Sequence, residues 1–130
     1  MPYEFTVSDR FPVPPADVYD AWMSSERHAA MTGAGAGIDP RPGGAFEAWD
    51  GYIAGTTLEL DPGRRIVQSW RTSEFAGRDP DSRIDVLLEP VDGGTLLTLH
   101  HTAIPDDQAG YEQGWRDNYF EPMRAYFAGG

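Results

Sequence analysis

The chain has 130 residues, of which 40% are hydrophobic and 24% charged, so its size fits one domain, residues 1–130, with a single core. It contains no cysteine and no lysine, which excludes disulfides, thiolate metal ligands, and thiol or lysine nucleophiles. A formal charge of -11 argues against nucleic acid as a partner, because binding to a phosphate backbone relies on basic side chains.

The sequence also bears on the compartment. No stretch is apolar over the roughly 20 residues that a membrane-spanning helix needs. The N-terminal segment carries acidic Glu4 and Asp9 and lacks the basic and apolar runs of a secretory signal. These features predict a cytoplasmic protein that has no membrane partner.

The N-terminal third is expected to form one strand and two short helices. Residues 3–13 alternate between apolar and polar side chains, which is the period of a half-buried strand. A first helix is expected to begin at Pro15 and to place Trp22 on its apolar face. Ser24 offers an N-cap for a second short helix, which is expected to stop at Gly33.

The glycine-rich run over residues 33–44 is similar to a phosphate-binding loop in composition alone. A phosphate loop follows a strand, opens a helix and has a Lys or Ser/Thr at a fixed offset. Short helices precede this run and a strand pattern follows it. We therefore interpret it as a loop that ends in a turn at Gly43-Gly44.

From Ala45 onward the sequence is typical of antiparallel strands joined by tight turns. Strands are expected at residues 46–49, 52–60, 65–72, 84–89 and 95–102. The breaks between them have turn composition, and short breaks imply antiparallel neighbours. In the last strand, alternation predicts that Leu99 and His101 face the core and that His100 faces the solvent.

The C-terminal segment is predicted to be one long helix. Its acidic start at residues 106–108 suits the helix dipole, and the helix is expected to run to about Phe127. Large rings recur along it at helical spacing and form an apolar face, which must pack on a wide concave surface. Pro122 lacks an amide hydrogen and clashes with the carbonyl of Asn118, which predicts a kink.

This order of elements is that of helix-grip folds, and several short runs sharpen the resemblance. They are D-G-Y-I-A-G at residues 50–55, P-G-R-R-I-V-Q-S-W-R at residues 62–71, Gly94-Thr95, Ile104-Pro105, Gly114-Trp115 and Tyr119-Phe120-Glu121. Over about residues 4–128 the set resembles the C-terminal, START-like (SRPBCC) domain of the activator of Hsp90 ATPase family. The resemblance implies an α+β helix-grip fold, in which a curved antiparallel sheet wraps a long C-terminal helix and two short helices follow the first strand.

The resemblance also implies a function. Members of the wider superfamily resemble carriers or sensors of small apolar ligands, and a few, such as polyketide cyclases, are enzymes. We therefore expect a protein that binds a small hydrophobic or aromatic molecule between sheet and C-terminal helix, without a cofactor. Hsp90 is the partner that the co-chaperone implies, although much of that contact belongs to a separate N-terminal domain. A homodimer through a sheet edge or an exposed helix stays open.

Eight residues are candidates for binding such a ligand, because each is a ring or a flexible apolar side chain expected to face the core. They are Trp22, Met31, Phe46, Trp70, His101, Trp115, Tyr119 and Met123. Trp70 on the sheet and Trp115 on the helix are expected on opposing walls. Simple core packing is the alternative interpretation of all eight.

His101 is the candidate for catalysis. Beside a carboxylate such as Glu47 or Glu59 it would act as the general acid or base of a cyclase, hydrolase or isomerase. A single inward histidine is more often a hydrogen-bonded core residue, so we expect a binding protein rather than an enzyme. His28 and His100 do not complete a metal-ligand spacing with His101, which predicts no metal site.

Two arginines on the central strand are candidates for binding a carboxylate. The guanidinium groups of Arg65 and Arg71 present the fork that pairs with two carboxylate oxygens. Such arginines pair more often with acidic surface neighbours, and we expect that role here.

Overall fold

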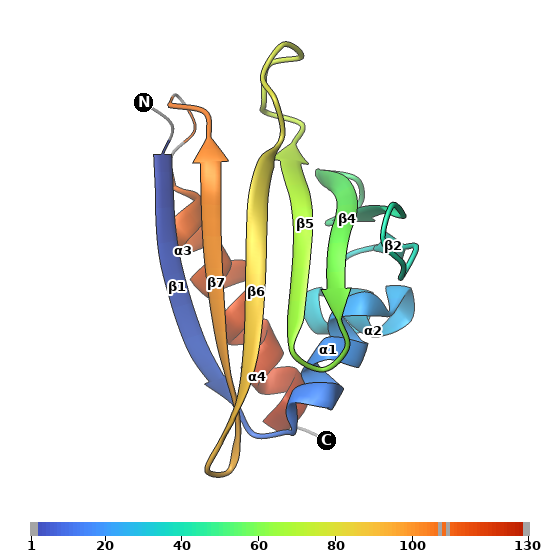
Figure 1. The fold of residues 1–130 in the computed structure, drawn as a ribbon, viewed down its shortest axis with the longest axis vertical. Helices are drawn as coiled ribbons and strands as arrows, with labels where there is room; N and C mark the ends of the chain where they lie inside the picture. Colours follow the sequence, from blue (N-terminus) through green and yellow to red (C-terminus); the bar gives the residue numbers. More distant parts are fainter. Residues whose placement is uncertain (1–2, 107, 109, 129–130) are drawn as a thin grey trace.

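The computed structural model describes residues 3–106, 108 and 110–128 and shows one curved antiparallel sheet (Figure 1). The elements are, in chain order, β1 (Tyr3–Phe11), α1 (Pro15–Met23), α2 (Ser25–Thr32), β2 (Gly37–Ile38), β3 (Ala45–Ala48), β4 (Ile53–Asp61), β5 (Arg65–Thr72), β6 (Ser82–Val91), β7 (Gly94–Ile104), α3 (Tyr111–Trp115), the π-helical turn η1 (Arg116–Phe120) and α4 (Glu121–Ala128). The expected α+β helix-grip fold is confirmed.

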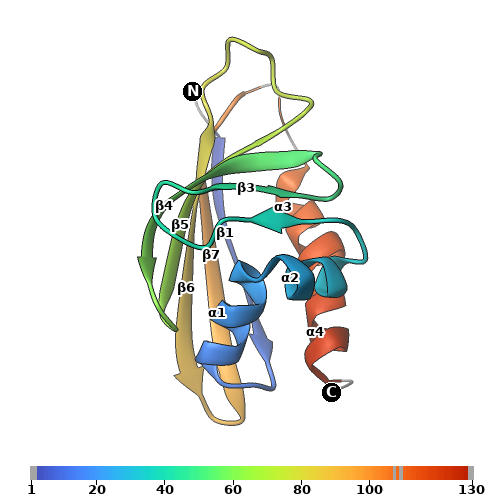
Figure 2. The ribbon, with the colours of Figure 1, turned by 90° about the vertical axis from the view of Figure 1, so that its right-hand side faces the viewer.

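The sheet contains seven strands in the order β1-β7-β6-β5-β4-β3-β2. Strands β2 to β7 follow one another as antiparallel neighbours, and β1 pairs with β7, so that the first and last strands of the chain lie side by side. Figure 2 shows the helices on the concave side of this sheet, and Figure 1 shows the C-terminal helix running diagonally behind the strands. This arrangement follows from the apolar face of each element, which must be buried against another layer.

The alternating pattern of the strands is confirmed in the last hairpin. Val86 on β6 and Leu99 on β7 are paired and fully buried, while Leu87 and His100, their neighbours along the chain, are exposed. His101 is 0% exposed, so its expected inward orientation is also confirmed. Side chains of one strand alternate between the faces of a sheet, and this places one row of each strand in the core.

Both N-terminal helices form as expected. Pro15 occupies the first turn of α1. The hydroxyl of Ser24 accepts a hydrogen bond of 3.2 Å from the amide of Arg27 and so caps α2. Gly33 ends α2 with a φ of 81°, and its amide donates to the carbonyl of Ala29.

The glycine-rich run is a loop, as interpreted, but it contains one strand that the sequence does not predict. The strand β2 pairs with β3 through Gly37 opposite Glu47 and Ile38 opposite Phe46. Two residues are too few for a periodic pattern, so only the long-range pairing reveals this strand.

The C-terminal helix differs from its expected form at both its start and its middle. It begins at Tyr111, not at residues 106–108, because Gly110 precedes it in a left-handed conformation with φ of 94°. Of the expected helix start, Asp107 lies outside the described residues. In place of a simple kink at Pro122, the structure has the π-helical turn η1 directly before it, where the amide of Glu121 donates to the carbonyl of Arg116.

A continuous cluster of buried apolar side chains fills the space between the sheet and the helices. Within the described ranges, no helix is long and apolar enough to cross a bilayer.

Candidate functional site

A pocket of about 400 Å3 lies between the C-terminal helix and the end of the sheet where β4 begins and β5 ends. Its walls come from the β3–β4 turn, from β4 and β5, from the β5–β6 loop, and from α3 and η1. The lining residues are Trp49, Tyr52, Ile53, Trp70, Glu74, Gly110, Tyr111, Gly114, Trp115, Asn118 and Tyr119. Six of these eleven residues are aromatic, so the pocket presents ring surface to whatever enters it.

The rings of this pocket contact one another from opposing walls. The ring centroids of Trp70 and Trp115 lie 5.6 Å apart, which confirms that sheet and helix bring these two residues together. Tyr111 packs edge-on against Trp70 at 5.1 Å, and Tyr119 lies 4.8 Å from Trp115. Trp49 meets Tyr119 edge-on at 6.5 Å. The aromatic surface is therefore continuous across the two layers.

Of the eight candidate residues, three line the pocket: Trp70, Trp115 and Tyr119. The other five are buried in the core and do not line it: Trp22, Met31, Phe46, His101 and Met123. Trp22 illustrates the difference. It stacks on Trp115 at 6.1 Å and on Tyr119 at 5.4 Å, and therefore supports the wall of the pocket rather than forming it.

The sequence interpretation missed six side chains of the pocket: Trp49, Tyr52, Ile53, Glu74, Tyr111 and Asn118. Tyr111 and Asn118 fall at helical spacing from Trp115, and that spacing is a signal that could have included them. The residues from turns carry no such periodic signal.

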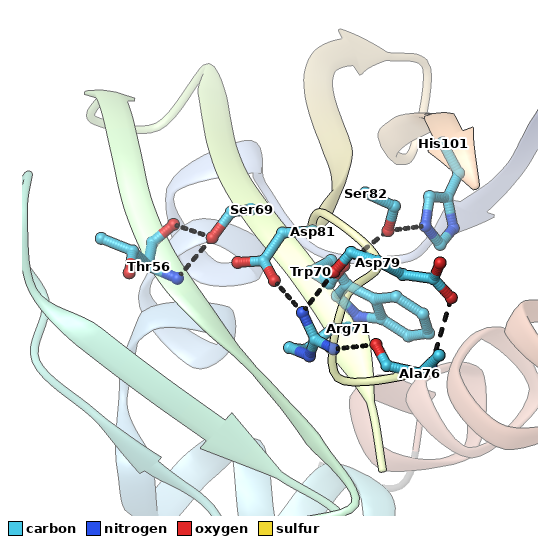
Figure 3. Close-up of polar contacts among 9 residues, drawn as sticks. All are labelled: Thr56, Ser69, Trp70, Arg71, Ala76, Asp79, Asp81, Ser82 and His101. Atoms are coloured by element: carbon cyan, nitrogen blue, oxygen red, sulfur yellow. Dashed lines mark hydrogen bonds and ion pairs between the residues drawn. The ribbon is translucent and has the colours of Figure 1, made fainter. Parts of the chain in front are cut away.

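His101 takes part in a continuous series of hydrogen bonds in the core. The indole Nε1–H of Trp115 donates to His101 Nδ1 at 3.1 Å, so the ring proton of His101 resides on Nε2. Nε2 then donates to the hydroxyl of Ser82 at 2.8 Å, and Ser82 donates to the carbonyl of Trp70 at 2.6 Å (Figure 3). Both ring nitrogens thus have hydrogen-bond partners, of which Trp115 lines the pocket and Ser82 does not.

These hydrogen bonds keep the imidazole of His101 neutral. Burial lowers the pKa of His101 to about 3, and protonation of Nδ1 would set two donors against each other. The carboxylate partner expected for catalysis is absent, because the ring nitrogens bind Ser82 and Trp115 rather than Glu47 or Glu59. Among the described residues, no group of three or more His, Asp or Glu side chains gathers as a metal site would require.

A second buried histidine holds the inner wall of the pocket. His28 Nδ1 donates to the carbonyl of Trp22 at 2.9 Å, so Nε2 accepts from the hydroxyl of Tyr119 at 2.8 Å. Burial lowers the pKa of His28 and raises the pKa of Tyr119. The hydroxyl of Tyr119 is therefore kept away from the pocket, which its ring faces.

Backbone strain is concentrated beside the pocket in the β3–β4 turn. Trp49 and Asp50 have φ angles of 54° and 56°, and Gly51 follows at 90°. The left-handed region is costly for a tryptophan. Asp50 Oδ1 accepts a hydrogen bond of 2.8 Å from the amide of Gly35, and the Asp50 amide donates to the Gly35 carbonyl at 3.0 Å. The glycine-rich loop therefore holds the turn that places Trp49 on the pocket.

Replacing Asp50 with alanine is expected to lower the free energy of unfolding by about 1 to 2 kcal/mol, because a charge-assisted hydrogen bond that offsets the strain is lost. Trp49 is the half-buried tryptophan of the pocket, so acrylamide should quench the fluorescence of the variant more strongly than that of the parent. D50N is the control, since asparagine tolerates the left-handed region and still accepts from Gly35. Equal quenching in D50A and D50N would contradict this role.

The rim of the pocket is polar. Tyr52 donates a short hydrogen bond to the carboxylate of Glu74. The side-chain amide of Gln108 donates to the Glu74 carbonyl at 3.1 Å, and the hydroxyl of Tyr111 lies 2.8 Å from Gln108 Oε1 and 2.8 Å from the Thr72 hydroxyl. These bonds tie the β5–β6 loop to the start of α3.

Arg71 organises the same β5–β6 loop from the other face of the sheet (Figure 3). Its guanidinium donates to Asp81 at 2.8 Å and to the carbonyls of Ala76 and Asp79 at 3.0 Å each. Arg65 makes a two-fold contact with the carboxylate of Asp85, at 3.0 and 2.5 Å. The expectation that these arginines pair with acidic neighbours is confirmed.

A model of the family described as "Activator of Hsp90 ATPase homolog 1-like protein" matches residues 12–128. The chain belongs to this family. The resemblance found in the short runs of the sequence is thereby confirmed.

Individual relatives agree with this membership. The chain is 28% identical over 125 residues to the "Activator of 90 kDa heat shock protein ATPase homolog" of Dictyostelium discoideum. The aligned region covers 94% of this chain and 32% of that protein. It is 27% identical over 128 residues to the human "Activator of 90 kDa heat shock protein ATPase homolog 1". That aligned region covers 98% of this chain and 38% of the human protein. The chain thus spans about a third of the length of these curated relatives.

A solved structure shares the fold of this protein. The crystal structure of an HSP90 activator from Plasmodium falciparum superposes with a TM-score of 0.87, with 24% sequence identity and 96% of each chain covered. At that identity the likeness concerns the fold alone.

Proposed function

We propose that this protein binds a small aromatic or apolar molecule in the pocket between β4, β5 and the C-terminal helix, and that it does so without catalysis or a cofactor. The observation that carries the proposal is the lining, in which six aromatic side chains surround a space of about 400 Å3. That volume lies within the range of small-molecule sites, and aromatic walls give most of their binding energy to flat apolar ligands.

The hydrogen bonding of His101 supports binding over catalysis. His101, the residue from which a general acid or base was expected, has both nitrogens in hydrogen bonds to Ser82 and Trp115. A histidine whose pKa is about 3 does not accept a proton near neutral pH. The pocket is therefore better suited to holding a molecule than to transferring protons.

Filling the pocket tests the proposal. Gly114 lines the pocket on α3, and a Cβ added there would lie an ordinary 3.9 Å from Asn118 Nδ2. G114L is expected to keep the fold, because leucine favours a helix over glycine, and to lose binding of the neutral fluorophore N-phenyl-1-naphthylamine. G114A is the matched control and should retain binding. Undiminished binding by G114L would place the ligand elsewhere.

The second candidate function is contact with Hsp90, since the curated relatives are named as activators of the ATPase of the 90 kDa heat shock protein. Such contact would use an outer surface rather than the pocket. A pull-down with Hsp90 of the same cell should then recover G114L as efficiently as the parent chain. Failure to recover either protein would remove this candidate.

The remaining expectations form part of the same proposal. We infer a single cytoplasmic domain, and the single continuous core cluster supports one folding unit. A homodimer stays an alternative that analytical ultracentrifugation would test.

A further inference from the structure

The charges around the pocket are one-sided. Among the described residues that line it, Glu74 is the one acidic side chain, and none is Arg or His. The chain has no lysine at all. Arg71, which follows the pocket residue Trp70 on β5, forms an ion pair with Asp81. A ligand in this pocket therefore meets one carboxylate and no basic side chain.

Glu74 is held at the pocket by hydrogen bonds to neutral groups. Its amide donates to the Thr72 hydroxyl at 3.2 Å, and its carbonyl accepts from Gln108 at 3.1 Å, so the backbone is fixed on both sides. Its carboxylate accepts from the hydroxyl of Tyr52, which also lines the pocket. Across the described ranges, no arginine forms an ion pair with Glu74. The negative charge is thus oriented by hydrogen bonds but is not neutralised.

The faces of the surrounding rings add to this negative potential. An aromatic face attracts a cation through its quadrupole, most strongly for tryptophan, and several rings around one site act together. Trp49, Trp70 and Trp115 all line the pocket. Edge-on packing sets the ring planes of Trp70 and Tyr111 at 82° and those of Trp49 and Tyr119 at 72° to each other, so the rings do not all lie parallel.

We propose that the pocket selects a cationic ligand, namely a protonated or quaternary amine carried on an aromatic or apolar body, with Glu74 as its counter-charge. This inference rests on the proposed function and names the ligand class. A carboxylate or phosphate ligand is disfavoured, because Glu74 would repel it and no basic side chain among the described residues of the pocket would pair with it. The formal charge of -11 on the whole protein adds to this repulsion.

Two probes of equal shape test the inference by quenching of tryptophan fluorescence. Phenyltrimethylammonium carries the charge, and tert-butylbenzene is its neutral isostere. The cation is expected to bind about tenfold more tightly than the isostere, which lies between an exposed and a fully desolvated cation–π contact. Because Glu74 is exposed, E74Q should keep the hydrogen bond from Tyr52 and weaken binding of the cation about fivefold, while the isostere binds unchanged.

The control for net charge is E89Q, which removes the same charge from an exposed position of β6 outside the pocket and should leave both affinities unchanged. Equal or tighter binding of the isostere, or an E74Q variant that keeps the tenfold preference, would overturn the cationic class. If G114L then still abolishes binding of the isostere, the proposed function stands without the inference. Failure of both probes and of N-phenyl-1-naphthylamine would remove both.

Discussion

Acidification from pH 7.5 to pH 4 is expected to lower the free energy of unfolding by about 3 kcal/mol through His101 alone. The pKa of His101 is about 3 in the folded state, against 6.5 for the ordinary group. The unfolded chain therefore binds more protons between these values. The stabilisation is fully present above about pH 6.5 and is lost as the pH falls toward 3, and His28, whose pKa burial also lowers, acts in the same direction.

Urea unfolding at several pH values between 7.5 and 4 measures this effect. H101N should be less stable at pH 7.5, since it breaks the chain between Trp115 and Ser82, but its stability should fall less steeply with acid. H100N is the matched control, because His100 is exposed on the same strand and its replacement should leave the slope unchanged.

The titration of His101 in the parent protein gives a second reading that does not depend on the variant folding. Its ring proton resonances should not shift between pH 7.5 and 5. A midpoint near 6.5, or an H101N slope equal to that of the parent, would contradict a closed, neutral imidazole and would restore His101 as a candidate acid or base.

Replacement of Gly55 by alanine is expected to cost at least about 3 kcal/mol or to prevent folding. A Cβ at this position would lie 2.0 Å from the carbonyl oxygen of Ser69 and 2.7 Å from the ring of Phe46. The oxygen belongs to the backbone of the neighbouring strand and cannot move without opening the pairing of β4 with β5. This close approach is the physical reason for glycine at the end of the D-G-Y-I-A-G run.

G77A is the control for this prediction. A Cβ on Gly77 meets nothing within 4 Å, so alanine there should change the free energy of unfolding little or raise it slightly. Thermal unfolding of the two variants distinguishes the cases directly. A G55A protein as stable as G77A would mean that β4 and β5 separate more easily than the packing indicates.

The parts of the fold that the sequence predicts well are those governed by local chemistry. Ser24 and Gly33 bound α2 as expected, since capping and the left-handed stop depend on single residues. Alternation placed His101 inside and His100 outside. By contrast, β2 exists only through pairing with β3, and Gly110 moves the start of the helix, so tertiary context decides both.

The pocket was predictable only in part, because periodicity tells which face of an element is buried but not how deeply. Trp70 and Trp115 were expected on opposing walls and line the pocket. Trp22 has the same pattern, yet it lies behind the wall. Trp49 and Glu74 belong to turns, and their positions depend on bonds to residues distant in sequence, such as the one between Asp50 and Gly35.

The central claim is that the aromatic pocket holds a small molecule, and native mass spectrometry tests it most directly. The parent protein, G114A and G114L would each be incubated with the small-molecule extract of the source cells and measured intact, and any adduct would then be released and identified. The account predicts a stoichiometric adduct on the parent and on G114A, and none on G114L. No adduct on any of the three, or an equal adduct on G114L, would contradict it.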